Sequence, residues 1–184
     1  MQSIIDACKD GSLPASPVVI ISNNAESGAL QRAAAEGIAA HHISSTSEGS
    51  ENSADQAIAD TLERHKVDLV VLAGYMKRIG PKTLSIFNNR ILNIHPCLLP
   101  KYGGKGMYGM RVHEAVIEAG DNESGVTIHL VNEEYDQGDI LAQEKVPVLQ
   151  GDTAQSLADR VLQLEHKLYP ETIANIIKGK INPG

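Results

Sequence analysis

The sequence predicts an α/β protein whose open, mostly parallel sheet has helices on both faces. Short β-branched runs alternate with stretches of helical periodicity, the pattern of strand–helix units wound around a parallel sheet. Residues 67–72 form the most apolar run, so we expect this strand to be central and covered on both faces. Two runs on either side of Gly138 predict a C-terminal antiparallel hairpin.

Each element is expected from its local pattern. Strands are predicted at 17–22, 40–44, 67–73, 90–94, 125–132 and 140–148. Helices are predicted at 2–9, 26–36, 54–66, 81–87, 111–119 and 153–168, the last continuing to about residue 178. Gly37 and Gly120 stand where left-handed C-caps belong. Capping boxes are predicted at Ser53 and Asp152, each with a Gln three residues on. Residues 44–53 are predicted to be a loop.

Composition limits the classes of protein that fit. The 184 residues suit one domain with a proper core. No apolar stretch approaches the roughly 20 residues of a membrane span, and the start shows no signal peptide. Cys8 and Cys97 give neither a disulfide framework nor a metal spacing, which favours a cytoplasmic protein. The net charge of −7 argues against a nucleic-acid partner.

The most informative residues are Asn93 and His95, two apart at the end of an apolar run. In a strand, both side chains leave on the same face. An amide can hold a developing oxyanion and an imidazole can move a proton, so the pair suits acyl transfer. Pro96 and Pro100 then force a loop, where scaffolds present reactive groups. The alternative is that both side chains only satisfy backbone groups at a strand end.

Residues 93–100, Asn-Ile-His-Pro-Cys-Leu-Leu-Pro, resemble the signature of the folate-dependent formyltransferases. Residues 125–131 and 135–140 resemble the second block of that family at the expected distance, and the resemblance runs from residue 1 to about residue 178. It implies the Rossmann-like formyltransferase fold. The closest resemblance is to members that formylate glycinamide ribonucleotide in purine synthesis, with 10-formyltetrahydrofolate as co-substrate and without a metal or a covalent intermediate.

The resemblance implies three catalytic residues. Asn93 corresponds to the amide that holds the formyl oxygen, His95 to the general acid/base and Asp136 to the carboxylate that pairs with the histidine. Histidine suits proton transfer because its ordinary pKa, about 6.5, is near working pH, and a nearby carboxylate raises that pKa. Asp139 is the neighbouring competitor, but the alignment of Gly138 favours Asp136. His129 corresponds to a structural or site-lining histidine.

Binding residues are also implied. Met76, Lys77, Arg78 and Ile79 match the segment that binds the pterin of the folate, although a basic residue at position 78 departs from the aliphatic residue often found there. The alternative for this segment is a solvated basic turn. Glu165 matches a glutamate that contacts the nucleotide substrate, for which Met76 is a second candidate; a solvated helix face is the alternative for Glu165.

The start of the sequence departs from the family. Family members begin with a strand and a Gly-rich turn that binds the ribose phosphate, whereas this sequence opens directly at helix 2–9. We therefore expect residues 1–184 to be a single formyltransferase domain truncated at its N-terminus, by a misassigned or trimmed start or by loss of function. The missing strand should leave backbone groups of its neighbours unpaired.

Two other functions need to be weighed. Gly104, Gly106 and Gly109 have the G-x-G-x-x-G spacing, but a dinucleotide fingerprint must directly follow a strand, and a proline-containing loop intervenes here. A folate-binding protein without catalysis is the alternative from another class, because the phosphate loop is absent. The related tRNA formyltransferases and formyltetrahydrofolate deformylases normally carry further domains, which these 184 residues do not include.

Overall fold

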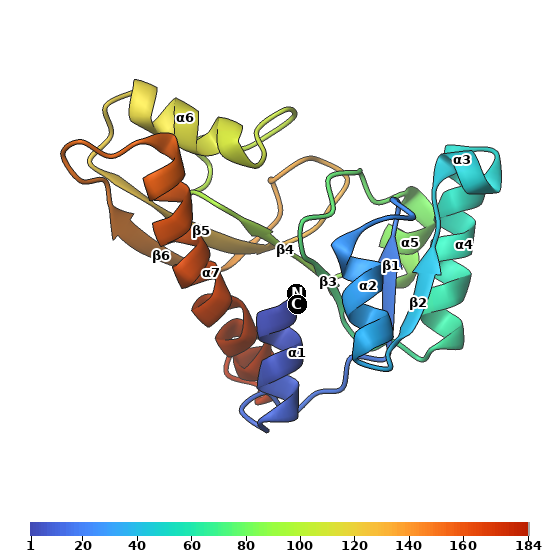
Figure 1. Cartoon of the computed structure of the whole chain (residues 1–184). Helices are drawn as coiled ribbons and strands as arrows, with labels where there is room; N and C mark the ends of the chain where they lie inside the picture. Colours follow the sequence, from blue (N-terminus) through green and yellow to red (C-terminus); the bar gives the residue numbers. More distant parts are fainter. Residues whose placement is uncertain (184) are drawn as a thin grey trace.

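The computed structural model describes residues 1–183. The helices are α1 (Gln2–Lys9), α2 (Gly28–Ala35), α3 (Ser45–Glu48), α4 (Glu51–Arg64), α5 (Pro81–Ile86), α6 (Met110–Glu118) and α7 (Ala154–Ile177). The strands are β1 (Val19–Ser22), β2 (Ala39–His42), β3 (Val70–Leu72), β4 (Ile91–His95), β5 (Glu123–Leu130) and β6 (Ile140–Pro147). The α/β class and each strand expected from the sequence are confirmed (Figure 1).

The strands form two sheets. One pairs β1 with β2 in parallel, and the other has the order β3-β4-β5-β6. In the second sheet β3 and β4 are parallel, whereas β4–β5 and β5–β6 are antiparallel. The predicted parallel pairs and the C-terminal hairpin are therefore present. The parallel pairs, however, lie in separate sheets, because β1 and β3 do not pair within residues 1–183.

The expectation that residues 67–72 form a central strand is wrong. Strand β3 lies at the edge of its sheet, and Val70, Val71 and Leu72 are only half-buried. The strands with neighbours on both sides are β4 and β5, and they hold the fully buried Leu92 and Ile128. Burial is set by the number of paired neighbours more than by the apolarity of the strand itself.

The helices cover the two sheets differently (Figure 1). Helix α7 runs along β5 and β6 and contacts α1 and α6, while α2 packs on β1 and β2, and α4 packs on α5. The largest core cluster lies between α7 and the β3–β6 sheet and includes Val126, Leu157 and Val161. The α7 residue Tyr169 is buried, and its hydroxyl donates to the carbonyls of Leu72 and Leu92. This contact fixes α7 beneath the parallel pair that carries the predicted site.

The predicted helix starts need two corrections. Helix α4 begins at Glu51 with Ser50 as its N-cap, not at residue 54 with Ser53 as cap. Helix α7 has Thr153 as its N-cap, and Ser156 completes the capping box predicted at Asp152. The predicted loop 44–53 contains the short helix α3. Neighbouring Ser, Thr and Asp residues can all cap, so local sequence alone does not select among them. The C-cap glycines are confirmed, since Gly37 and Gly120 both have positive φ.

No helix of the described part of the chain combines the length and the apolar character that crossing a membrane requires.

Candidate active site

The candidate site lies where the parallel strands β3 and β4 end. Leu72, the last residue of β3, is in register with Asn93 of β4. On the other side of β4, Asn93 pairs with His129 of β5 and His95 pairs with Thr127. The two-residue spacing therefore places the Asn93 and His95 side chains on one face, as predicted. Ligands of open α/β sheets bind outside the carboxyl ends of the strands, which is where these side chains lie.

The Asn93 amide is held by His129. Asn93 Nδ2 lies 3.1 Å from His129 Nε2, and His129 Nδ1 lies 2.8 Å from the Leu130 carbonyl oxygen. A neutral imidazole has one donor and one acceptor nitrogen. Donation from Nδ1 to the Leu130 carbonyl leaves Nε2 to accept from Asn93, which fixes which end of the amide is the N–H donor. The remaining N–H of Asn93 is thereby available for a substrate oxygen.

The His95 ring is buried, with 4% of its surface exposed. Its Nε2 lies 2.8 Å from the Tyr102 carbonyl oxygen, and its Nδ1 lies 3.7 Å from Asp136 Oδ2. Burial lowers the pKa of His95, and His129 adds to this effect, whereas Asp136 and the Tyr102 carbonyl oppose it. The carboxylate thus acts in the predicted direction, but burial prevails. A neutral ring donates from Nε2 to Tyr102 and keeps Nδ1 free to accept a proton.

Asp136 completes the group in the connection between β5 and β6. It has a positive φ of 56°, and its Oδ2 accepts a 2.8 Å hydrogen bond from the Gly104 N–H. Its Oδ1 lies 3.5 Å from His129 Nε2. Burial raises the pKa of Asp136, but donation from His129 Nε2 when that ring carries a second proton, the Gly104 N–H and His95 outweigh burial and hold that pKa below its ordinary value. The structure therefore brings all three predicted catalytic side chains together, with a carboxylate facing the imidazole.

Gly138 shapes the same connection. A Cβ at this position would collide with the carbonyl group of Leu130, the last residue of β5. Only glycine allows the chain to approach the end of β5 so closely and return to it as β6. The close approach places Asp136, two residues earlier, beside the two histidines.

Thr127 was missed by the sequence analysis, although it holds the loop that follows His95. Its hydroxyl donates to the Cys97 carbonyl at 2.7 Å and accepts from the Leu99 N–H at 3.1 Å and Gln143 Nε2 at 2.8 Å. Thr127 is fully buried, so these bonds satisfy groups that water does not reach. Its position two residues before His129 in a strand was the signal that it shares the face of that histidine.

The segment predicted to bind folate lies in the loop after β3. Met76, Lys77 and Arg78 are exposed, whereas Ile79 is buried. Arg78 donates to the Glu133 carbonyl in the β5–β6 connection, so the loop is joined to the connection that carries Asp136. In the described part of the chain, no hydrogen bond or ion pair joins this loop directly to the three catalytic side chains. Arg78 thus joins the loop after β3 to the β5–β6 connection and is also part of a basic turn.

Glu165 is half-buried in α7 and does not lie on a solvated face. Burial raises the pKa of its carboxyl group, and the amino group of Met1 opposes this effect. Glu165 lies one turn before Tyr169 and so shares the face of α7 that meets β3 and β4. The structure brings Glu165 close enough to the Met1 amino group of α1's N-cap to feel its charge, and no hydrogen bond or ion pair among residues 1–183 joins Glu165 to Asn93 or His95.

The glycine-rich loop before α6 belongs to the site through its backbone. Gly104, Gly106 and Gly109 all have positive φ, and Gly104 donates to Asp136. The loop does not follow a strand directly, because β4 ends at His95, so it lacks the context of a dinucleotide fingerprint. His113 of α6, which sequence reasoning also missed, is buried with an unpartnered Nδ1, and burial and His95 lower its pKa.

The comparison with known proteins identifies the family. The model of the formyl transferase family matches residues 1–173. The chain belongs to the formyl transferase family. It is 44% identical over 181 residues to the chloroplastic phosphoribosylglycinamide formyltransferase of Arabidopsis thaliana, covering 98% of this chain and 62% of the relative. It is 42% identical to the phosphoribosylglycinamide formyltransferase of Haemophilus influenzae, covering 98% and 83%.

A solved structure of this family agrees with the fold. Glycinamide ribonucleotide transformylase 1 from Symbiobacterium toebii superposes with a TM-score of 0.90 at 40% sequence identity, covering 97% of this chain and 82% of that one. The resemblance inferred from residues 93–100 and 125–140 is thus confirmed at the level of the family. The chain spans less than two thirds of the length of the Arabidopsis relative.

Proposed function

We propose that residues 1–184 act as a formyltransferase domain that moves the formyl group of 10-formyltetrahydrofolate to the primary amine of glycinamide ribonucleotide. The observation that carries the proposal is the convergence of Asn93, His95 and Asp136 at the carboxyl end of β4, in a chain whose relatives are named for this reaction. Both substrates are small molecules, and no nucleic acid, membrane or metal takes part.

The chemistry follows from the geometry. The substrate amine attacks the formyl carbon, and the second N–H of the Asn93 amide donates to the oxygen as it becomes an oxyanion. His95 takes the amine proton on Nδ1, because Nε2 is held by the Tyr102 carbonyl. The imidazolium is then stabilised by Asp136, whose Oδ2 lies 3.7 Å from Nδ1. His95 returns the proton to the leaving nitrogen of tetrahydrofolate, and the carbon–nitrogen bond breaks.

Cys97 takes no covalent part in this scheme. The side chain is fully buried and its Sγ donates to the Lys101 carbonyl at 2.9 Å. Burial raises the pKa of the Cys97 thiol to about 12, so the nucleophilic thiolate does not form at neutral pH.

For the location of the protein we propose the cytoplasm. Cys8 and Cys97 are both free thiols, which suits a reducing compartment.

For the folate we propose the loop containing Met76, Lys77, Arg78 and Ile79 together with the β5–β6 connection. A cavity of about 480 Å³ lies between α5 and this connection and is lined by Leu84, Val131 and Gly138, among others. Its lining combines the apolar Leu84 and Val131 with more numerous polar residues such as Asn132, and it does not include residues 76–79. The cavity therefore supports only the part of the proposal that concerns the β5–β6 connection, where a heterocycle would meet both apolar and hydrogen-bonding groups. For the nucleotide we propose Glu165 and Met76, because Glu165 is held on the face of α7 that meets β3 and β4.

The first experiment incubates the chain with both substrates and follows loss of the formyl donor, with His95→Ala as the paired variant. Turnover that needs both substrates and His95 is the expected result. Calorimetric titration with each substrate alone accompanies it. A chain that binds folate but ignores the ribonucleotide and shows no turnover is instead a folate-binding protein without catalysis, and the proposed function is then wrong.

A further inference from the structure

Two histidines outside the candidate active site face one another. His41 of β2 and His65, the C-cap of α4, have their Nε2 atoms 3.3 Å apart. The ring centroids are 5.4 Å apart and the ring planes are inclined at 64°. Both side chains are half-buried, so the pair is ordered by its surroundings and still reachable from solvent. The proposed formyl transfer uses neither ring.

The distance between the two Nε2 atoms is the distance expected for two imidazoles that bind one metal ion. Imidazole nitrogens bind zinc at about 2.0–2.1 Å, and a tetrahedral angle between two such bonds gives a nitrogen–nitrogen distance of about 3.3 Å. We propose that His41 and His65 form a two-imidazole binding site for a divalent transition-metal ion of the zinc class, with water in the remaining coordination positions. The alternative is a single N–H···N hydrogen bond between two neutral rings, which needs no metal.

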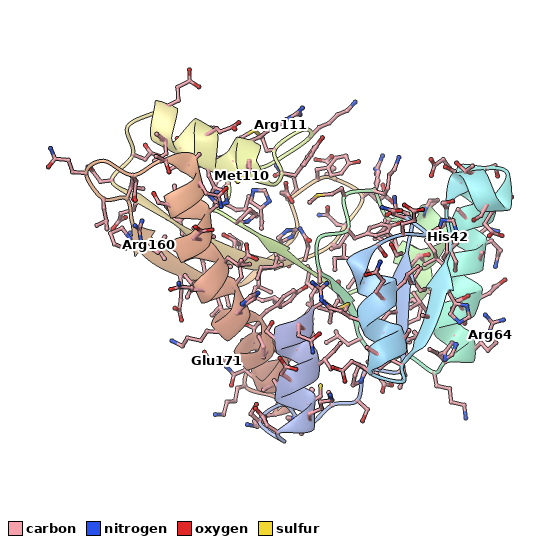
Figure 2. All side chains as sticks on the ribbon, viewed as in Figure 1. His42, Arg64, Met110, Arg111, Arg160 and Glu171 are labelled. Carbon is pink, nitrogen blue, oxygen red and sulfur yellow. The ribbon has the colours of Figure 1, made fainter. Side chains whose placement is uncertain are left out.

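A metal ligates the neutral form of imidazole, and the surroundings of His41 favour that form. Burial, His65 and Arg64 together lower the pKa of His41. Arg64 donates to the Thr61 hydroxyl at 3.0 Å. Figure 2 labels His42 and Arg64, the chain neighbours of the two histidines, in the half of the molecule that contains β1 and β2. The pair therefore lies in the other half from α6, where Met110 and Arg111 are labelled.

The site would be an open one. Residues 1–183 contain no group of three or more His, Cys, Asp or Glu side chains arranged to hold a metal. Two protein ligands give weaker binding than the three or four of dedicated zinc sites. A metal on this pair would link β2 to the end of α4 and therefore brace the part of the fold whose strands are paired least. Zinc binding should accordingly raise the melting temperature in a concentration-dependent way.

The test titrates the whole chain with zinc chloride at neutral pH by calorimetry. The variants are His41→Gln and His65→Gln, and the matched control is His42→Gln, which changes the exposed neighbour on the opposite face of β2. We expect one saturable site in the wild type and in His42→Gln, and loss of that site in each of the other two variants. Binding that is unchanged in His41→Gln and His65→Gln, or absent from the wild type, overturns the proposal.

A second measurement does not depend on whether the variants fold. Nitrogen-15 spectra of the histidine rings in the wild-type chain report which nitrogens bind zinc. Of the seven histidines, we expect the Nε2 signals of His41 and His65 to shift together with added zinc. The melting temperature should rise in parallel. Shifts confined to other histidines, such as His95 or His129, would place the metal elsewhere and contradict the assignment.

Discussion

The two sheets of this molecule differ in how tightly they hold their residues. Strands β4 and β5 each have neighbours on both sides, and β5 is buried from Ser124 to Leu130. Strands β1 and β2 pair only with each other within the described chain, and of their residues Ser22 alone is buried. The predicted catalytic residues lie on or beside the first sheet, whose pairing fixes backbone positions on both sides of β4.

The difference shows where polar side chains can be kept in defined positions. In the β3–β6 sheet the buried His95, Thr127 and His129, which surround the site, have hydrogen-bond partners, although the Ser124 hydroxyl at the far end of β5 has none. In the β1–β2 sheet the half-buried His41 lies within hydrogen-bond distance of another histidine, His65. Full partnering of buried polar groups makes a site rigid. Matched changes in the two sheets should therefore have different consequences.

The largest expected effect is loss of catalysis when His95 is changed. His95→Ala should lower kcat by at least about 10², the usual contribution of a general acid/base. The matched change His41→Ala removes an imidazole from the other sheet and should leave kcat within the error of the assay. Steady-state rates for both variants under saturating substrates make the comparison. Equal losses in the two variants would mean that His95 contributes only to folding.

Asp136→Asn tests the electrostatic part of the site. Asp136 raises the pKa of His95, and an active general base must be unprotonated. Removing the carboxylate therefore lowers the pKa of His95 further, so the acidic limb of the kcat profile should move to lower pH. A pH series on the wild type and the variant measures the position of the limb. An active variant with an unmoved limb would show that His95 is not tuned by Asp136.

Thr127→Val should separate positioning from folding in the catalytic sheet. The change keeps the shape of the side chain but removes the hydroxyl that accepts from the Leu99 N–H. A buried group left unsatisfied costs about 1–3 kcal/mol, so urea unfolding should show a loss of that size. The loop after His95 should also loosen and kcat should fall. A variant with wild-type stability and rate would contradict the assigned role.

The sequence predicted the face shared by Asn93 and His95 because strand geometry depends only on a two-residue period. The proximity of Asp136 could not be obtained in that way, since it depends on how the β5–β6 connection returns past Gly138; the family motif supplied it. The contacts of His95 with the Tyr102 carbonyl and of Asp136 with the Gly104 N–H involve backbone groups. Every residue carries such groups, so no residue type signals their role.

The central position predicted for residues 67–72 failed for a related reason. An apolar strand is stabilised when its faces are buried, but whether it has a neighbour on both sides depends on pairing partners elsewhere in the chain. The sequence of a strand does not by itself show whether the strand lies at the edge of a sheet, where one row of backbone groups is unpaired. The helix caps show the same limit at shorter range, because Ser50 and Ser53 compete for one helix start and their side chains bond to each other.

The smallest effect concerns a cap in the less buried half. Ser27 is the N-cap of α2, the helix that packs on β1 and β2, and its side chain accepts from the Leu30 N–H at 3.4 Å. Ser27→Ala should cost about 0.5–1 kcal/mol of stability, the lower part of the usual range for a lost cap, because this bond is long. The matched change is Thr153→Ala, which removes the cap of α7, the helix that packs on the catalytic sheet. Thr153 accepts from the Ser156 N–H at 3.2 Å.

The two variants together test whether the sheets unfold together. If the two sheets fold as one cooperative unit, urea unfolding will report both losses in a single transition. If they are independent, hydrogen exchange will show Ser27→Ala speeding amide exchange in β1 and β2 alone, while the amides of β4 and β5 keep wild-type protection.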